Sequence, residues 1–204
     1  MQHIAFDLGN VLLDLDWAPF YHVLDELNIS HEEMNSFMKF HNRSDFCGLI
    51  TLKQAFEESF DQTEVDLLIE GWNAIIRPHD QMVNFVKQLK YEGVKVAFLS
   101  NMGFDHLNLL RKDFPDFMNL ADVQHMSCEV GAAKPSIIYY QSFLLEHEDF
   151  AGCLYLDDLY ENVIMGSKVK FESMQFDLNN FKNKPPSLLK KELTKIQDRM
   201  LKGS

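Results

Sequence analysis

The sequence contains little cysteine, and none of it is paired. Its three cysteines, Cys47, Cys128 and Cys153, are odd in number and lack CxxC spacing, which excludes a disulfide framework and predicts reduced thiols. None of the eight histidines has an HxxxH or HxxEH partner, and His125 with Cys128 forms only HxxC. These absences exclude the usual zinc sites, so we expect structural roles for these residues.

Basic residues and long apolar segments are also scarce. The chain has 19 Lys and Arg against 31 Asp and Glu, a formal charge of -12. Because phosphate backbones are neutralised by clustered cations, this charge excludes an extended nucleic-acid-binding surface. No apolar run approaches the roughly 20 residues of a membrane span, and the N-terminus lacks the basic region of a leader. We therefore expect a cytoplasmic protein with no membrane and no nucleic acid partner.

Short apolar runs that end in polar residues predict buried strands. There are four of them, at residues 3–7, 94–100, 123–127 and 153–157. Helical patterns lie between them, for example at residues 81–91 and 136–146, and hydrophobic residues make up 46% of the chain, enough for a sizeable core. Alternating strands and helices predict an α/β fold with a Rossmann-like, three-layer core around a parallel sheet.

One interval interrupts this alternation. It contains no convincing strand but four helical stretches, at residues 17–27, 31–40, 52–60 and 64–75. We interpret residues 16–76 as a helical cap inserted between the first and second strands, which leaves residues 1–15 and 77–181 as the α/β core.

The C-terminal segment differs from the rest in charge. Residues 182–204 hold seven Lys or Arg against two acids, and apolar residues recur there at helical spacing: Leu189, Leu193, Ile196 and Met200. This predicts one basic amphipathic helix. Docking on its own domain is the interpretation we favour; pairing with a second subunit or lying on a membrane surface are the alternatives, so we expect a monomer or a homodimer.

Chemically reactive side chains follow the ends of the predicted strands. In chain order they are Asp7, Ser100 with Asn101, Lys134, and Asp157 with Asp158. Singly, each has an ordinary interpretation as a cap, a turn, a loop or a solvent-facing acid pair. Together they supply carboxylates, a hydroxyl and an ammonium at the carboxyl edge of one sheet, which is what phosphoryl transfer requires. Oxygen ligands of this kind suit Mg²⁺, so we expect magnesium as cofactor and a small phosphorylated substrate.

Four segments carry a resemblance to a known family: IAFDLGNVLLD, VAFLSN, GAAKP and LYLDDLYEN, in this order. Over roughly residues 1–176 the chain resembles the haloacid dehalogenase-like hydrolase superfamily. Within it, the DLGNV motif is most similar to bacterial sugar phosphatases, including the α-D-glucose-1-phosphate phosphatase branch. The resemblance implies a phosphatase, with a sugar phosphate as substrate.

The resemblance also implies roles for the residues that transfer the phosphoryl group. Asp7 would be the nucleophile that becomes an aspartyl phosphate and is then regenerated by water. Ser100 and Asn101 would hold the phosphoryl group during transfer. Lys134 would neutralise the phosphate and the nucleophile.

A second set of residues is implied for the metal. Asp158, with Asp157 close by, would bind magnesium together with Asp7 and the main-chain carbonyl of Gly9. Asn162 would support the loop that carries the acid pair.

The chain departs from the family pattern at Gly9. Most phosphatases of this superfamily have a second aspartate there, which protonates the leaving oxygen and later activates water. Either another side chain replaces it, with Asp14, Asp16 and His22 as candidates, or the substrate has a leaving group that needs no acid, such as an anomeric or acyl phosphate.

Three other functions remain open from the residues alone. A 2-haloacid dehalogenase also lacks the second aspartate, but it needs no metal, which the paired acids of LYLDDLYEN disfavour. A phosphate-accepting receiver module has similar residues in a different order. A catalytically impaired binding protein of the same fold is the third alternative, because Gly9 removes a group that most active relatives use.

Overall fold

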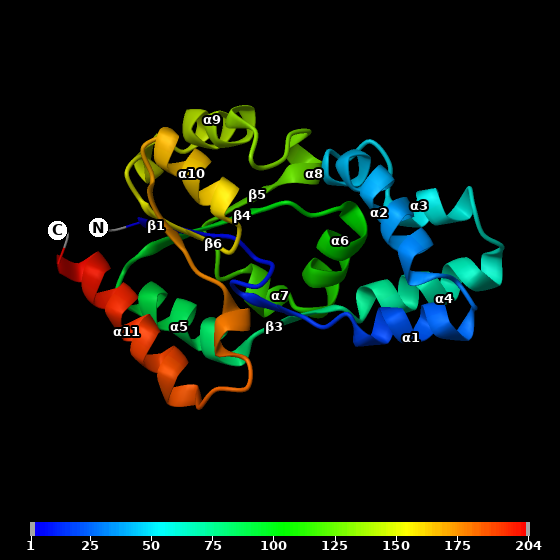
Figure 1. The fold of residues 1–204 in the computed structure, drawn as a ribbon. Helices are drawn as coiled ribbons and strands as arrows, with labels where there is room; N and C mark the ends of the chain where they lie inside the picture. The colour runs from blue at the N-terminus through cyan, green and yellow to red at the C-terminus, as the bar shows by residue number, and fades with distance from the viewer. Residues whose placement is uncertain (1–2, 203–204) are drawn as a thin grey trace.

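A five-stranded parallel sheet forms the centre of the protein (Figure 1). The computed structural model describes residues 3–202. The sheet has the order β5-β4-β1-β6-β7, and its strands are β1 (His3–Phe6), β4 (Lys95–Ser100), β5 (Val123–Met126), β6 (Leu154–Asp157) and β7 (Glu172–Gln175). Every neighbouring pair is parallel. The predicted α/β fold is confirmed, and β7 is an additional edge strand.

Side chains alternate between the two faces of the sheet, and each face packs against a different set of helices. Ile4 and Phe6 belong to the larger core cluster, whereas Ala5 belongs to the smaller one on the other face. The larger cluster includes apolar residues of α5 (Asp80–Tyr91), α6 (Phe104–Asp113), α7 (Pro115–Met118) and α11 (Pro186–Lys202). The smaller cluster includes residues of α9 (Ile137–Glu146) and α10 (Tyr160–Lys168). The result is the predicted three-layer arrangement.

Four helices are inserted between β1 and β4 and form the smaller lobe in Figure 1. They are α1 (Ala18–Glu26), α2 (His31–Phe46), α3 (Leu52–Glu57) and α4 (Gln62–Asn73). The Thr51 hydroxyl accepts from the Gln54 N–H while the Gln54 side chain accepts from the Thr51 N–H, so this capping box fixes the start of α3. Helix α2 extends beyond the predicted end at residue 40, because a polar stretch hides the continuing helix from the apolar pattern.

Two short strands join the insertion to the core. Strand β2 (Leu13–Leu15) pairs antiparallel with β3 (Ile76–Pro78), so the chain leaves and re-enters the core at the same place. Each strand has only three residues, too few for an alternating pattern. The sequence therefore did not predict this pair, which fixes where the helical lobe begins.

The remaining short helices lie in connections. They are α8 (Ser127–Val130), η1 (Glu148–Phe150) and η2 (Leu178–Phe181). Gly131 ends α8 in the left-handed conformation, at φ 74°, which a glycine adopts without strain. The loop that carries Lys134 starts from this turn.

The C-terminal helix α11 packs on its own domain. Its four regularly spaced apolar residues, Leu189, Leu193, Ile196 and Met200, are all buried in the larger core cluster. Figure 1 shows α11 alongside α5 on the same side of the sheet. All three cysteines are free thiols, and within residues 3–202 no helix has the length and apolarity that a membrane crossing requires.

Candidate active site

The side chains singled out from the sequence meet at the carboxyl edge of the sheet. Asp7 follows β1, Ser100 ends β4 and Asp157 ends β6, and these three strands are neighbours. Lys134 reaches the same edge from the loop after α8. Parallel strands present their carboxyl ends together, which is why residues far apart in the sequence form one cluster.

The Lys134 ammonium is the centre of this cluster. Its Nζ lies 2.8 Å from Asp7 Oδ1 and 2.7 Å from Asp157 Oδ2, and it donates to the Leu99 carbonyl at 2.9 Å. The Lys134 side chain is only 1% exposed. All three of its donors are therefore used, and a buried cation of this kind is stable only because its partners are close.

Burial and charge oppose one another at Lys134 and Asp7. Burial alone would lower the pKa of Lys134, but the carboxylates of Asp7 and Asp157 outweigh it and raise the pKa above its ordinary value, so the ammonium stays charged. Burial raises the pKa of Asp7 to about 7, Lys134 lowers it, and the Asp157 and Asp158 carboxylates raise it. The cluster thus has more negative than positive groups, and an additional cation would relieve it.

Asp157 has no free acceptor position. Its Oδ1 accepts from the Leu159 N–H and the Asn162 side chain, both at 2.9 Å, while its Oδ2 accepts from Lys134 and from the Tyr155 hydroxyl. A carboxylate has about four acceptor positions, and four donors occupy them here. Asp157 therefore holds Lys134 and the loop after β6, and it is a poor candidate for direct metal binding.

Asp158 has free acceptor positions. Its Oδ2 accepts from the Asn10 side chain at 3.1 Å, and the residue is partly exposed. One ligand atom each from Asp7, Asp157 and Asp158 lies within 4.8 Å of the others, and only oxygen ligands are present. This donor chemistry fits Mg²⁺, with Asp7 and Asp158 as the carboxylates that would hold it.

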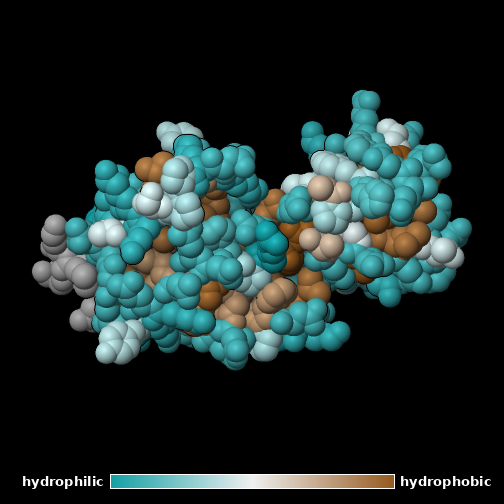
Figure 2. Space-filling model, turned by 90° about the horizontal axis from the view of Figure 1, so that it is seen from below, coloured by the Kyte–Doolittle hydropathy of each residue, from teal (hydrophilic) through white to brown (hydrophobic). Residues whose placement is uncertain are grey.

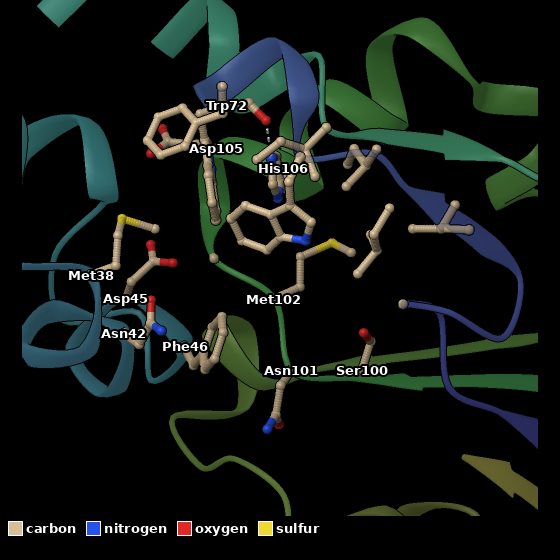
Figure 3. Close-up of a pocket in the computed structure, with 18 of the residues that line it drawn as sticks. Met38, Asn42, Asp45, Phe46, Trp72, Ser100, Asn101, Met102, Asp105 and His106 are labelled. Atoms are coloured by element: carbon tan, nitrogen blue, oxygen red, sulfur yellow. Dashed lines mark hydrogen bonds between the residues drawn. The ribbon is translucent and has the colours of Figure 1, made fainter. Parts of the chain in front are cut away.

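Ser100 and Asn101 point in different directions. The Ser100 hydroxyl points toward the cavity in Figure 3, whereas the Asn101 amide points away from it. Asn101 Nδ2 donates to the Lys134 carbonyl at 2.9 Å, and Asn101 Oδ1 accepts from the Lys134 N–H at 2.8 Å. The Asn101 side chain therefore clamps the Lys134 loop, and only its main-chain N–H remains for a phosphate.

The three predicted substitutes for the missing acid lie outside the cavity next to this cluster. Asp14 on β2 is 3.8 Å from Arg77, and Asp16 is exposed and accepts from the Ala18 N–H at the start of α1. His22 is exposed and lies 3.3 Å from Glu26. None of them is in the cavity lining.

A cavity of 340 Å³ lies between the helical lobe and the strand ends (Figure 3). Gly9, Ser100 and Asn101 form its floor. Its apolar wall consists of Leu13, Leu15, Trp17, Phe20, Met38, Phe46, Trp72, Ile75, Ile76 and Met102. Figure 2 shows hydrophobic residues gathered in the hollow between the two lobes.

Burial shifts the pKa of two titratable residues in this cavity in the direction that favours the uncharged form. Burial lowers the pKa of His106 to about 4, and its Nε2 donates to the Trp72 carbonyl at 2.9 Å. Burial, with Asp105 adding to it, raises the pKa of Asp45 to about 7, while a hydrogen bond from the Leu52 main chain acts in the opposite direction. Asp45 is 3% exposed, and its Oδ1 has no partner within residues 3–202.

A second, wider hollow of 630 Å³ adjoins the cavity. Both are lined by Lys39, Asn42, Phe46 and Asn101, and the second also includes Arg43 and Lys134. Lys39 and Arg43 are exposed, and no carboxylate of the described chain pairs with either. In a protein with a formal charge of -12, two unpaired cations beside Lys134 favour approach of an anion by this route.

Sequence reasoning missed Asn10, Tyr155 and Asp45. Asn10 has φ 53°, a conformation that asparagine tolerates, and this turns its side chain onto Asp158. Tyr155 lies inside a strand, where the sequence pattern predicts an ordinary core residue. Asp45 is one carboxylate in a polar helix segment, and nothing in the sequence says that this face is buried.

Comparisons with known proteins found a distant relative in sequence and several similar folds. No protein family model matches the chain. A sesquiterpene phosphatase from Aspergillus oryzae is 23% identical over 171 residues, 80% of this chain and 84% of that protein. A HAD family enzyme from Bacteroides thetaiotaomicron has a TM-score of 0.75 and 18% identity, covering 86% of this chain and 93% of that chain.

Two further structures carry ligands. The wild-type protein of that Bacteroides enzyme in complex with magnesium and inorganic phosphate has a TM-score of 0.74 and 17% identity, covering 86% and 93% of the two chains. An L-2-haloacid dehalogenase from Xanthobacter autotrophicus with chloropropionic acid covalently bound has a TM-score of 0.57 and 15% identity, covering 85% and 76%. The chain therefore has the fold of the haloacid dehalogenase-like hydrolases.

The two neighbouring acids should respond differently to the same substitution. Asp157→Asn replaces a carboxylate that accepts from four donors with an amide whose NH₂ group cannot accept, and it removes one of the two negative charges beside Lys134. We therefore expect a loss of about 3–5 kcal/mol in the free energy of unfolding. Asp158→Asn should change it by less than about 1 kcal/mol, but should abolish any rise in melting temperature on adding MgCl₂. Urea unfolding and thermal melts with and without millimolar MgCl₂ measure both effects. Equal destabilisation by the two variants would contradict this division of roles.

Asp45 should make the protein less stable as pH rises. Its pKa is raised in the folded state, so the folded protein holds this proton more tightly than the unfolded chain does, and the stabilisation is lost as pH rises from about 4 through about 7. Asp45→Asn should therefore be more stable than wild type at pH 8, by up to about 4 kcal/mol, with a smaller difference at pH 5. Urea unfolding at both pH values measures this. The control is Asp66→Asn, at an exposed acid on α4. If Asp45→Asn changed the stability equally at both pH values, titration of Asp45 would not explain the change.

Proposed function

We propose that this chain, which has the fold of the haloacid dehalogenase-like hydrolases, is a magnesium-dependent phosphatase that acts on a small organic phosphate. The observation that carries the proposal is the position of Lys134, whose Nζ lies 2.8 Å from Asp7 Oδ1 at the end of a parallel strand. A nucleophilic carboxylate beside a buried cation, with further carboxylates for a metal, is the arrangement that phosphoryl transfer through an acyl phosphate needs.

The residues of the cluster divide the reaction between them. An Asp7 oxygen attacks phosphorus, the bond from phosphorus to the leaving oxygen breaks, and the leaving oxygen takes a proton from water. Water then attacks the phosphorus of the aspartyl phosphate, which releases orthophosphate and restores the Asp7 carboxylate. Lys134 offsets the negative charge on both Asp7 and the phosphoryl oxygens, and the Ser100 hydroxyl and the Asn101 N–H hold those oxygens.

Magnesium would be held by Asp7, Asp158 and the main-chain carbonyl of Gly9. When bound, it would neutralise charge on the phosphoryl oxygens. Asp157 keeps Lys134 in position, and Asn162 keeps Asp157 in position through their 2.9 Å hydrogen bond.

The cluster's charge favours phosphate over halide chemistry. Three carboxylates lie within 4.8 Å of one another, and Lys134 is the one ammonium in contact with them among the described residues. A dehalogenase working without a metal would leave this excess charge uncompensated at the nucleophile. The intact contacts of Asp7, Lys134 and Asp157 also argue against an impaired binding protein.

Similarity to known proteins suggests two substrate classes. The sequence resemblance predicts a sugar phosphate, as in the α-D-glucose-1-phosphate phosphatases. The Aspergillus relative is a sesquiterpene phosphatase, whose name denotes an apolar substrate. The active-site cluster accommodates the phosphoryl group of either, so the choice depends on the cavity above it.

Hydrolysis of p-nitrophenyl phosphate tests the proposal. We expect turnover with MgCl₂, its loss with EDTA, and its loss in Asp7→Asn, because the amide is not a nucleophile. Asp116→Asn, at an exposed acid on α7, is the matched control and should retain activity. Turnover by Asp7→Asn would refute the assignment, and chloride release from 2-chloropropionate in EDTA would indicate the dehalogenase instead.

Gly9 offers a test of the missing acid. Its φ is not left-handed, and a Cβ built there would meet only Leu15 Cδ1, at an ordinary 3.5 Å. Gly9→Asp should therefore be tolerated and should restore a proton donor at the cavity floor. We expect kcat for ethyl phosphate, a poor leaving group, to rise by about 10² or more, and kcat for p-nitrophenyl phosphate to change much less.

Gly9→Asn is the matched control for this experiment. It has the same shape as the aspartate variant but cannot donate and accept a proton in turn. A similar gain from both variants, or no gain from either, would show that a proton donor at this position does not limit the reaction.

A further inference from the structure

The cavity continues directly from the phosphate site. Gly9, Ser100 and Asn101 belong to its lining and also to the loops that surround Asp7 and Lys134. A phosphoryl group held at Asp7 would therefore direct the rest of its ester into this cavity. The chemistry of the wall then decides which esters fit.

The wall is predominantly apolar and comes from both parts of the protein. The helical lobe contributes Trp17 just before α1, Phe46 at the end of α2 and Trp72 on α4, among others, and the loop after β4 contributes Met102 from the opposite side. Figure 3 shows Met38 and Phe46 facing Met102 across the space. Such a wall gains free energy by removing hydrocarbon from water.

The lining offers a sugar few buried polar groups: Asn35, Lys39 and Asn42 lie at exposed or half-buried positions of α2, and the buried groups above the floor are His106 and Asp45. His106 already donates to the Trp72 carbonyl, and the Asp105 carboxylate accepts from the Lys53 N–H. Asp45 has one oxygen without a partner. A sugar brings several hydroxyl groups, and each one buried without a partner is costly.

We infer that the cavity binds the hydrocarbon part of an apolar organic phosphate, so that the substrate is an ester with an alkyl, alkenyl or aromatic group rather than a sugar phosphate. This inference rests on the proposed phosphatase function, which places the phosphoryl group on the cavity floor. The 340 Å³ volume lies near the lower end of the about 300–1,000 Å³ typical of small-molecule pockets. The hydrocarbon group is accordingly small enough to be enclosed.

A series of n-alkylphosphonates from ethyl to octyl tests the inference. They are not hydrolysed and differ only in tail length, so their inhibition constants against p-nitrophenyl phosphate turnover report binding of the tail. We expect the constant to fall about fourfold for each added methylene until the cavity is full, which corresponds to about 0.8 kcal/mol for each. Glucose 1-phosphate and glucose 6-phosphate should bind no more tightly than ethylphosphonate.

A second measurement reports occupancy without turnover. The chain has two tryptophans, Trp17 and Trp72, and both line the cavity. Octylphosphonate, below its micelle concentration, should change their fluorescence in Asp7→Asn with MgCl₂ present, whereas orthophosphate, which reaches only the floor, should change it little.

Trp17→Ala links the effect to the wall. Trp17 is 39% exposed, so its removal should leave the fold intact while opening the cavity. The inhibition constant of octylphosphonate should rise at least tenfold and that of orthophosphate should not change. Phe40→Ala removes an aromatic ring of α2 that is 80% exposed and outside the cavity, and it should leave both constants as in wild type.

The two proposals fail in different ways. Turnover of p-nitrophenyl phosphate without any dependence on tail length, or with tighter binding of the glucose phosphates, would overturn the apolar substrate and leave the phosphatase standing. Absence of turnover would refute the phosphatase. The fluorescence titrations would then decide the cavity alone: tail-length-dependent affinity would support an apolar site, and its absence would overturn it.

Discussion

The site depends on the two ion pairs that the buried Lys134 ammonium forms with Asp7 and Asp157. The ammonium brings together β1, β6 and the loop after α8, three segments that are far apart in the sequence. A buried cation is tolerated only with its partners in place, so the loop must close for the fold to be stable, and closing it also assembles the candidate active site. The Asn101 side chain reinforces this with two hydrogen bonds to the main chain of Lys134. At this edge of the sheet, the contacts that stabilise the fold are thus also the contacts that assemble the site.

The sequence was sufficient to predict the elements whose residue patterns are regular. Buried parallel strands are short apolar runs, and their polar ends meet at one edge, so Asp7, Ser100 and Asp157 could be grouped from their positions alone. The sequence was not sufficient where a contact depends on three-dimensional packing. Nothing in an acid pair tells which carboxylate is saturated, and only the contacts with Lys134, Tyr155, Leu159 and Asn162 show that Asp157 is the structural one. The strands β2 and β3 were missed because three residues carry no period.

The packing of the helical cap was even harder to predict from the sequence. Its helices were predicted from apolar periodicity, yet periodicity does not say which apolar face meets the core and which faces a cavity. Asp45 illustrates this: it lies in a polar segment of α2, but packing against Gly103 buries it, since a Cβ at position 103 would be 2.1 Å from its Oδ2. Glycine at that position is what allows α2 to approach the loop after β4. The chemical character of the cavity therefore emerges from tertiary contacts and not from any motif.

Gly9 and the apolar wall have a common consequence for catalysis. In the proposed phosphatase, which lacks an acid at position 9, the means of lowering the barrier are the fixed charges of the cluster and the orientation of the ester. Binding energy from a part of the substrate that does not react can serve that orientation, because a tail that occupies the cavity helps to hold the phosphorus opposite Asp7. The wall also keeps the local dielectric constant low, which strengthens the attraction between Lys134 and the phosphoryl oxygens. In the proposed phosphatase, binding of a hydrocarbon tail would thus compensate in part for the missing proton donor, so the glycine at position 9 and the apolar wall are physically consistent with each other.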